Sequence, residues 1–452
     1  MVVREARAHE LIPSARRLIE SLRDMGYDFA QAVADIVDNA IEARATKVDV
    51  DVKFDGDESW VQIADNGKGM NPEDLREAMR YGYEREYEED DLGKFGLGLK
   101  TASMSQCRSL SVASRCRTSG AEVPAYCWDL DHIEKANRWE ILPVGRTGLG
   151  TSMRQPLKDK TGTVVLWQRL DRILGHSHPY GEAARKRILQ MCRELEIHLA
   201  MVFHRFLAGE VPGKQLTIRL NENPLTPWDP FCRSEAKTKR LQPVRLSLEH
   251  EGTRGDVVLQ PFVLPHQEDF SSAQAFHDAS GPAAWNQQQG FYVYRAGRMI
   301  QSGGWSNLRA PDEHTKLTRI ALSFGPSLDE AFKINVAKMR VQIPAQIREQ
   351  VRQAIGPALT LARETYDRKP RRGTDRPTPP PGAGPTAAQG AGTGPQGASG
   401  DPRLHPKEPP AEELLTFEQW ADRMLVAANR HERKVIRAVL SRMRSSARAR
   451  QR

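Results

Sequence analysis

Four short motifs in the amino-terminal part of the chain combine residue types that could bind a nucleotide. The first places Asp35, Asp38, Asn39 and Glu42 at positions that share one face of a helix, with apolar residues between them for the packed side. A hard cation such as Mg²⁺ prefers oxygen ligands, which an Asn carbonyl, phosphate oxygens and water provide. Taken alone, the helix could instead present a solvated acidic face, which is the less favoured alternative.

The second motif, Asp65-Asn-Gly67-Lys-Gly69-Met70, directly follows a strand-like segment. A carboxylate at the end of a strand can accept a hydrogen bond from an exocyclic amine. The two glycines would let the backbone approach a flat ring closely. Taken alone, the same residues also make an ordinary turn.

The third motif contains Gly93, Gly96 and Gly98 and runs into a helical pattern, which suits a phosphate cradle at a helix N-terminus. It is not a Walker A loop, because Leu99 follows Gly98 where that loop requires Lys. The polar, acidic segment before it could serve as a mobile lid. The fourth motif, Gly162-Thr163, opens a strand. Such a pair is common at the start of strands, and taken alone it usually has no functional role.

The elements that must position these motifs can be predicted from the periodicity of the sequence. Residues 14–26 and 28–45 have helical patterns, and residues 48–55 and 59–65 alternate as strands around a turn at Gly56-Asp57. The order is helix, helix, strand, strand and glycine-rich turn. This order predicts an α+β, two-layer α/β sandwich instead of the strand-first order of a P-loop or dinucleotide fold.

Together and in this order, the motifs resemble those of the GHKL ATPase superfamily (gyrase B, heat-shock chaperone, histidine kinase and MutL). The segments ADIVDNAIEARAT, DNGKGM and LGKFGLGLKTASMS look closest to the MORC/MutL-like branch, and the resemblance covers about residues 10–210. It implies a Bergerat-type ATP-binding domain that uses ATP and Mg²⁺. It also implies that Asn39 holds Mg²⁺ and that Asp65 receives the adenine amine, assisted by a water that Thr163 contacts. The remaining implied contacts are Gly67, Gly69 and Met70 around the base, and a lid over the phosphates made by Gly93, Lys94, Phe95, Gly96, Leu97, Gly98 and Lys100.

One position departs from the family pattern. Members that hydrolyse ATP through a general base usually have Glu where this chain has Asp35. Asp is one methylene shorter, which withdraws its carboxylate by roughly 1.5 Å from an attacking water that it must reach by a hydrogen bond. We therefore expect that ATP is hydrolysed slowly to ADP and phosphate, or that a shift of the helix brings Asp35 within reach of the water. Glu42 is a less favoured candidate for the general base.

Composition divides the chain into four segments. We expect a GHKL-type domain at 1–210, a transducer-like α+β domain at 211–366, a disordered Pro/Gly-rich linker at 367–412 and a basic amphipathic C-terminal helix at 413–452. In the second domain, residues 290–305 predict a two-stranded ribbon that turns at Ala296-Gly297, with its aromatic residues in the core. Lys338 lies in a phrase similar to the family loop whose Lys reaches the γ-phosphate. An ordinary surface Lys is the alternative, and Lys333 and Arg340 are rivals for the role.

The overall composition restricts the partners. The chain has 452 residues and a net charge of +8, which permits DNA as a partner without establishing it. It contains no run of 18 apolar residues and no secretory signal at its start, so we expect a cytoplasmic protein that does not span a membrane. The basic C-terminal segment suits a DNA contact and a partner protein equally well.

These features favour an ATP-gated switch or clamp that forms an ATP-dependent homodimer and acts in DNA transactions such as repair or genome defence. A chaperone-like machine that acts on protein clients would use the same ATP-binding head. A nucleotide-dependent scaffold with little hydrolysis is a third possibility, because of Asp35. A sensor histidine kinase is disfavoured, since no pair of helices with a phospho-acceptor His precedes the motifs.

Overall fold

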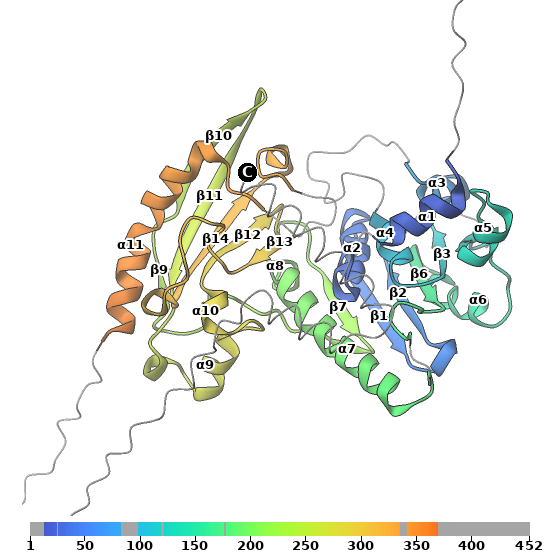
Figure 1. Ribbon diagram of the computed structural model, residues 1–452, viewed down its shortest axis with the longest axis horizontal. Helices are drawn as coiled ribbons and strands as arrows, with labels where there is room; N and C mark the ends of the chain where they lie inside the picture. The colour runs from blue at the N-terminus through green and yellow to red at the C-terminus, as the bar shows by residue number, and fades with distance from the viewer. Residues whose placement is uncertain are drawn as a thin grey trace, which may run out of the picture. The chain divides into compact units, whose positions relative to one another are not determined.

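The computed structural model describes residues 13–24, 26–82, 98–118, 122–175, 178–334 and 341–368. The chain divides into two compact units, Met1–Arg372 and Gly373–Arg452. The C-terminal helix expected at 413–452, and the linker from residue 369 onward, lie outside the described residues. In the first unit, Figure 1 shows two β-sheets with helices packed against each.

The first sheet has eight strands among the described residues, in the order β5-β4-β3-β6-β2-β1-β7-β8. Neighbouring strands are antiparallel, except for the parallel pair of β1 and β7. The strands are β1 (Lys47–Lys53), β2 (Trp60–Asp65), β3 (Ser109–Arg115), β4 (Ala125–Asp129), β5 (Leu142–Pro143), β6 (Gly162–Gln168), β7 (Thr217–Leu220) and β8 (Asn223–Pro224). The sheet that carries the motifs therefore extends beyond residue 210, to Pro224.

The expected hairpin between the first two strands is present, but its loop is longer than a two-residue turn. Lys53 pairs with Trp60, and a 3-10 turn at Gly56–Glu58 lies between the strands. Ser59 folds back over this loop, because its hydroxyl accepts from the Asp55 N–H at 2.8 Å and donates to the Gly56 carbonyl at 2.7 Å. These side-chain bonds stabilise the wider loop.

Both helices expected before the first strand are present, as α1 (Ala15–Arg23) and α2 (Phe29–Glu42). They pack on one face of this sheet, with α3 (Pro72–Met79), α4 (Gly98–Met104), α5 (Leu130–Ala136), α7 (Glu182–Val202) and α8 (His204–Leu207). The short α6 (Leu149–Ser152) packs in a separate cluster with side chains of the other face. Helix α2 begins where the Asp28 side chain accepts from the Gln31 N–H at 2.8 Å, an N-cap. The apolar side of α2 then packs with α1, α7 and the sheet in one core. This packing holds the polar stripe of α2 in a fixed place.

The second sheet has the strand order β10-β11-β14-β12-β13, with β9 paired to β11, in the described part of the chain. Its strands are β9 (Lys239–Arg240), β10 (Val244–His250), β11 (Thr253–Val263), β12 (Gly290–Arg295), β13 (Arg298–Ser302) and β14 (Thr318–Phe324). The α-helices that accompany it in the described residues are α9 (Ala273–Ala279), α10 (Ala284–Gln288) and α11 (Arg348–Tyr366). The fold is thus an α/β sandwich followed by a second sheet with its own helices, which agrees with the predicted α+β class.

The predicted ribbon at residues 290–305 is the hairpin of β12 and β13. Its two turn residues, Ala296 and Gly297, have positive φ of 47° and 87°, the geometry that suits a tight two-residue hairpin. The aromatic residues Phe291, Tyr292 and Tyr294 are fully buried in the core. They are core residues, as expected, and not a surface for stacking bases.

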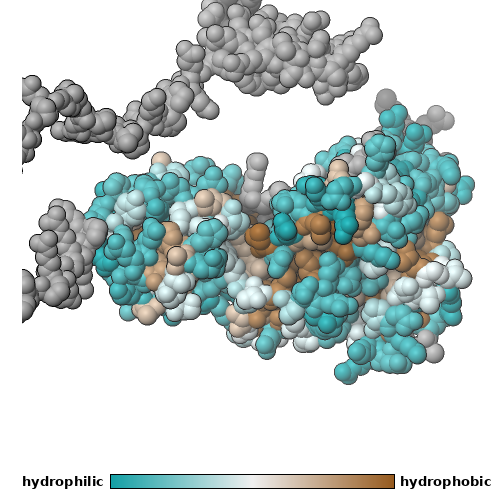
Figure 2. Space-filling model, turned by 90° about the horizontal axis from the view of Figure 1, so that it is seen from below, coloured by the Kyte–Doolittle hydropathy of each residue, from teal (hydrophilic) through white to brown (hydrophobic). Residues whose placement is uncertain are grey.

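The face of the molecule in Figure 2 is mainly hydrophilic, with hydrophobic residues gathered near its middle. Among the described residues, the large apolar side chains with the most exposure are Leu18, Leu189, Ile197 and Tyr180, and Leu189 and Ile197 lie on α7. No helix in the described ranges combines the length and the apolar character needed to cross a membrane.

Candidate functional site

Asp65 lies at the end of β2, where two backbone N–H groups hold its carboxylate. Its Oδ1 accepts from Gly67 at 2.8 Å and from Thr163 at 3.3 Å. Burial raises the pKa of this carboxyl from 3.8 to about 6, although the two backbone donors oppose the shift. Because both donors use Oδ1, Oδ2 is available to accept from a ligand amine.

The glycines after Asp65 are required by close backbone packing. A Cβ on Gly69, which has φ of +65°, would lie 1.9 Å from the Arg115 carbonyl oxygen, and a Cβ on Gly67 would lie 2.7 Å from Ala43. The Lys68 N–H also donates to the Ala43 carbonyl at 2.8 Å. The glycine turn is therefore fastened both to the C-terminal end of α2 and to β3.

Ser114 is a site residue that the motifs did not indicate. It lies on β3 opposite Thr163 of β6, and it is fully buried. Its hydroxyl accepts from the Met70 N–H at 2.9 Å and lies 3.0 Å from the Gly162 carbonyl and 2.9 Å from the Thr163 hydroxyl. One hydroxyl thus connects the second motif to the fourth. A polar residue within a buried strand is the signal that could have revealed it.

Asp35 is buried on α2, with only 4% of its surface exposed. A Cβ built on Gly98, the first residue of α4, would lie 3.7 Å from Asp35 Oδ2. Burial, and then the negative charge of Asp35, raise the pKa of the Tyr27 hydroxyl. Asp35 therefore faces both Tyr27 and the start of the helix that follows the third motif.

The other polar residues of the α2 stripe have different surroundings. Asp38 is 1% exposed, whereas Asn39 and Glu42 are partly exposed. Asn39 thus combines an amide oxygen, a ligand type that suits a hard cation, with access from outside the core. A solvated acidic face does not describe this stripe, since two of its carboxylates are buried.

The third motif is only partly visible. Gly93, Lys94, Phe95, Gly96 and Leu97 lie outside the described residues. Lys100 is buried on α4, and its Nζ donates to the carbonyls of Ala78 at 2.9 Å and Arg80 at 2.8 Å. Burial lowers the pKa of Lys100 to about 8. Lys100 thus caps the end of α3, and its expected contact with phosphate stays a prediction.

The candidates from the second domain are also only partly visible. Lys338 and its rival Arg340 lie outside the described residues. Lys333 is exposed and has a positive φ of 51°. The second sheet does bring one residue to the α2 stripe that the sequence did not indicate: Arg298, at the start of β13, which pairs with Asp38.

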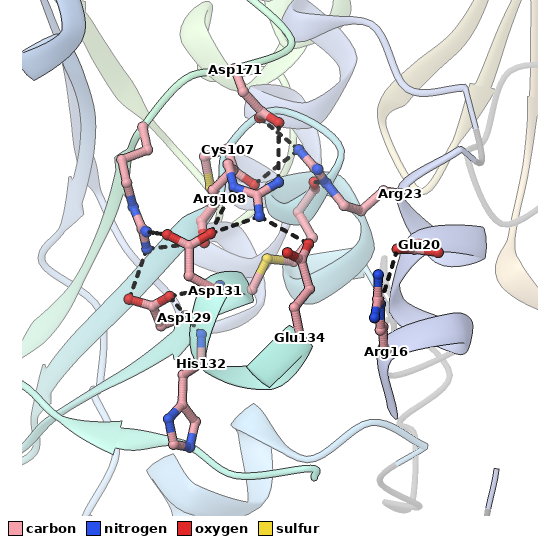
Figure 3. A network of polar contacts seen from close by, with 12 residues as sticks. Arg16, Glu20, Arg23, Cys107, Arg108, Asp129, Asp131, His132, Glu134 and Asp171 are labelled. Carbon is pink, nitrogen blue, oxygen red and sulfur yellow. Dashed lines mark hydrogen bonds and ion pairs between the residues drawn. The ribbon is translucent and has the colours of Figure 1, made fainter. Parts of the chain in front are cut away.

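A separate polar network, drawn in Figure 3, has a structural role. Arg23 at the end of α1 lies 2.6 Å from Asp171, and Arg108 lies 2.7 Å from Asp131 and 2.9 Å from Glu134. These pairs fasten α1 and α5 to the ends of β3 and β6. Each of these five charged side chains has a partner of opposite sign, so we assign no ligand to the network.

Comparison with known proteins agrees with this site. Residues 27–163 match the family model described as histidine kinase-, DNA gyrase B-, and HSP90-like ATPase. The match begins at Tyr27, beside Asp35, and ends at Thr163, which contacts Asp65. Residues 27–163 are therefore similar to the ATPase domain that this family model describes, and the match includes all four motifs.

Similar proteins fall in the MORC/MutL-like branch. Protein MICRORCHIDIA 4 of Arabidopsis thaliana is 39% identical over 92 residues, which cover 19% of this chain and 11% of that protein. The DNA mismatch repair protein MutL of Rippkaea orientalis is 38% identical over 97 residues, covering 20% and 17%. MutL of Crocosphaera subtropica is 30% identical over 158 residues, covering 30% and 27%. The chain thus matches less than a third of the length of each of these relatives.

Proposed function

We propose that this chain binds Mg²⁺–ATP at the site between Asp35 and Thr163 and hydrolyses it slowly. The observation that carries the proposal is the Asp65 carboxylate, which two backbone N–H groups hold through one oxygen so that the other can accept the adenine amine. Asn39, on the neighbouring helix, would supply an oxygen to Mg²⁺. These donor and acceptor groups fit an adenine nucleotide at this place.

Asp35 is our candidate for the general base. It lies on the same face of α2 as Asn39, close to the start of α4, so that a water near the terminal phosphate could be within its reach. The short Asp side chain supports a slow rate. Lys338 would sense the terminal phosphate from the second domain.

The test is the pair of variants Asp35→Asn and Glu42→Gln. Each removes one carboxylate from the same helix face, two turns apart, without changing side-chain size. We expect Asp35→Asn to abolish turnover in a phosphate-release assay and to leave the affinity for a non-hydrolysable ATP analogue within about threefold. Glu42→Gln should retain turnover. Unchanged turnover in Asp35→Asn contradicts the assignment of the base.

The wider function that we propose is a cytoplasmic, ATP-gated switch or clamp that dimerises with ATP and acts on DNA. The relatives named MutL are DNA mismatch repair proteins, which supports this choice. Sedimentation with a non-hydrolysable analogue, and turnover with and without DNA, test it. ATP-dependent dimers with DNA-stimulated turnover support the clamp, whereas turnover with neither dimers nor a DNA effect favours a chaperone-like machine.

A second candidate is a nucleotide-dependent scaffold that barely hydrolyses ATP. The observation that favours it is Asp35 itself, which is both short and buried beside the cation Arg298. ATP-dependent dimers without measurable turnover would select the scaffold over the clamp.

A further inference from the structure

Arg298 crosses from the second sheet to the α2 stripe. It is the first residue of β13, it is 5% exposed, and its Nε lies 2.9 and 2.8 Å from the two carboxylate oxygens of Asp38. Its Nη2 lies 4.0 Å from Asp35 Oδ1. A single guanidinium therefore faces two buried carboxylates that are one helical turn apart.

The hairpin that carries Arg298 is held firmly in place. Its turn residue Gly297 packs so closely on the core beside the first sheet that a Cβ there would lie 2.7 Å from Val211, which packs against that core. Nη1 of Arg298 donates to the Met299 carbonyl at 3.2 Å, which fixes the orientation of the guanidinium. The position of the charge beside α2 thus depends on the docking of the second sheet.

Asp35 is consequently placed between two parts of the molecule. Its Oδ2 faces the start of α4, after the third motif, while its Oδ1 faces Arg298. Two buried carboxylates at this separation would repel each other without a cation nearby. Removing only the guanidinium of Arg298 would leave the carboxylates of Asp35 and Asp38 buried without the positive charge that it supplies.

We propose that Arg298 is a positioning residue for the ATPase reaction: by pairing with Asp38 and facing Asp35, it keeps the candidate base anionic and oriented only while the second sheet is docked. Arg298 thereby makes turnover depend on the second domain through a residue other than Lys338. This inference rests on the proposed function of Asp35. It assigns to the second sheet a direct influence on the base itself.

Other charged or titratable groups face the same place. Tyr27 precedes α2, Asp28 is the N-cap of α2, and His198 lies on α7. Burial, and then the positive charge of Arg298, lower the pKa of His198 to about 4, so this His is neutral at neutral pH. Among these described residues, Arg298 is the group that brings a positive charge beside Asp35. Asp28 is engaged at the N-cap of α2. Turnover falls toward low pH along the acid limb of its pH profile. The position of this limb should therefore depend mainly on Arg298.

The test compares Arg298→Gln with Arg298→Lys and with a control, Arg205→Ala. Arg205, on α8, also reaches the second sheet, but it stacks on the Tyr294 ring and donates to the Ser323 hydroxyl at 3.2 Å. The control thus weakens the same contact between domains without removing charge from α2. Turnover is measured against pH with the full chain, together with affinity for a non-hydrolysable ATP analogue and the melting temperature.

We expect Arg298→Gln to lower kcat by about 10- to 100-fold, to change analogue affinity by less than about threefold, and to move the acid limb up by about one pH unit or more. Arg298→Lys, which keeps the charge but loses the planar fork, should keep the acid limb near that of the wild type. This lysine variant also serves if the glutamine variant does not fold. Arg205→Ala should leave the acid limb unchanged.

The inference is overturned if Arg298→Gln and Arg205→Ala lower turnover equally with the same acid limb, or if Arg298→Lys moves the limb upward. Failure of the proposed function is distinguishable from both. In that case the wild type shows no turnover, or Asp35→Asn keeps it, whatever residue is present at position 298.

Discussion

Replacing Asp65 by Asn should change folding stability and nucleotide affinity in opposite directions. The substitution keeps the size of the side chain and an oxygen for the Gly67 and Thr163 donors. It removes a carboxyl whose pKa is raised from 3.8 to about 6 in the folded protein. The two effects arise from the same group, so they can be measured on one variant.

The stability effect follows from proton linkage. Between about pH 4 and pH 6 the folded state binds more protons at Asp65 than the unfolded chain, so the wild type loses stability as pH rises through this window. The difference between a pKa of 3.8 and one of about 6 corresponds to at most about 3 kcal/mol of stability, which is lost in full above pH 6. The amide that replaces the carboxyl is neutral at every pH. Asp65→Asn should therefore be more stable than the wild type at pH 7.5, and the difference should vanish below about pH 4.

The binding effect follows from the direction of the hydrogen bond. The amide introduced by Asp65→Asn would present an N–H group to the adenine amine, so two donors would face each other at a cost of about 2–3 kcal/mol, or roughly 30- to 150-fold in affinity. Inosine triphosphate has a carbonyl oxygen at this position of the base and should bind the variant better than ATP does. Calorimetric titration with both nucleotides, and chemical unfolding at several pH values, measure the two effects. Equal loss of affinity for both nucleotides, or lower stability at pH 7.5, would refute the role of Asp65.

Two further predictions concern the residues that hold the glycine turn. Ser114→Ala should lower the free energy of unfolding by about 1–3 kcal/mol, because the Met70 N–H loses its acceptor. Unfolding in urea measures this change. A change below about 0.5 kcal/mol, the size expected of an exposed substitution, would contradict this role. Gly69→Ala should be strongly destabilising, since its Cβ would overlap the Arg115 carbonyl, whereas Gly82→Ala, with a similar positive φ but open space around it, should lose only about 1–2 kcal/mol. Equal melting temperatures for the two alanine variants would contradict the close packing of Gly69.

The local parts of the fold and site could be predicted from the sequence, because they depend on neighbours in the chain. Helix α2 and its polar stripe follow from a 3.6-residue period and the capping Asp28, and the turn after Asp65 follows from its glycines. The fold class then follows from the order of these elements. In each case the interacting residues lie within a few positions of one another.

The parts that could not be predicted depend on pairing between distant segments. Ser114 joins the site only because β3 and β6 pair in a register that places it opposite Thr163. Arg298 lies 260 residues after Asp38, its partner. The bonds from Lys100 to the carbonyl groups at the end of α3 depend on how α3 and α4 pack, while its contact with phosphate stays a prediction. No local pattern specifies such contacts.

The most direct test of the proposed function is an experimental structure of the full chain with Mg²⁺ and a non-hydrolysable ATP analogue. We expect the adenine amine within hydrogen-bond distance of Asp65, Mg²⁺ on the Asn39 carbonyl oxygen, and the terminal phosphate beyond the start of α4, on the Asp35 side. An analogue bound elsewhere, or an adenine with no contact to Asp65, would contradict the proposal that this site binds ATP.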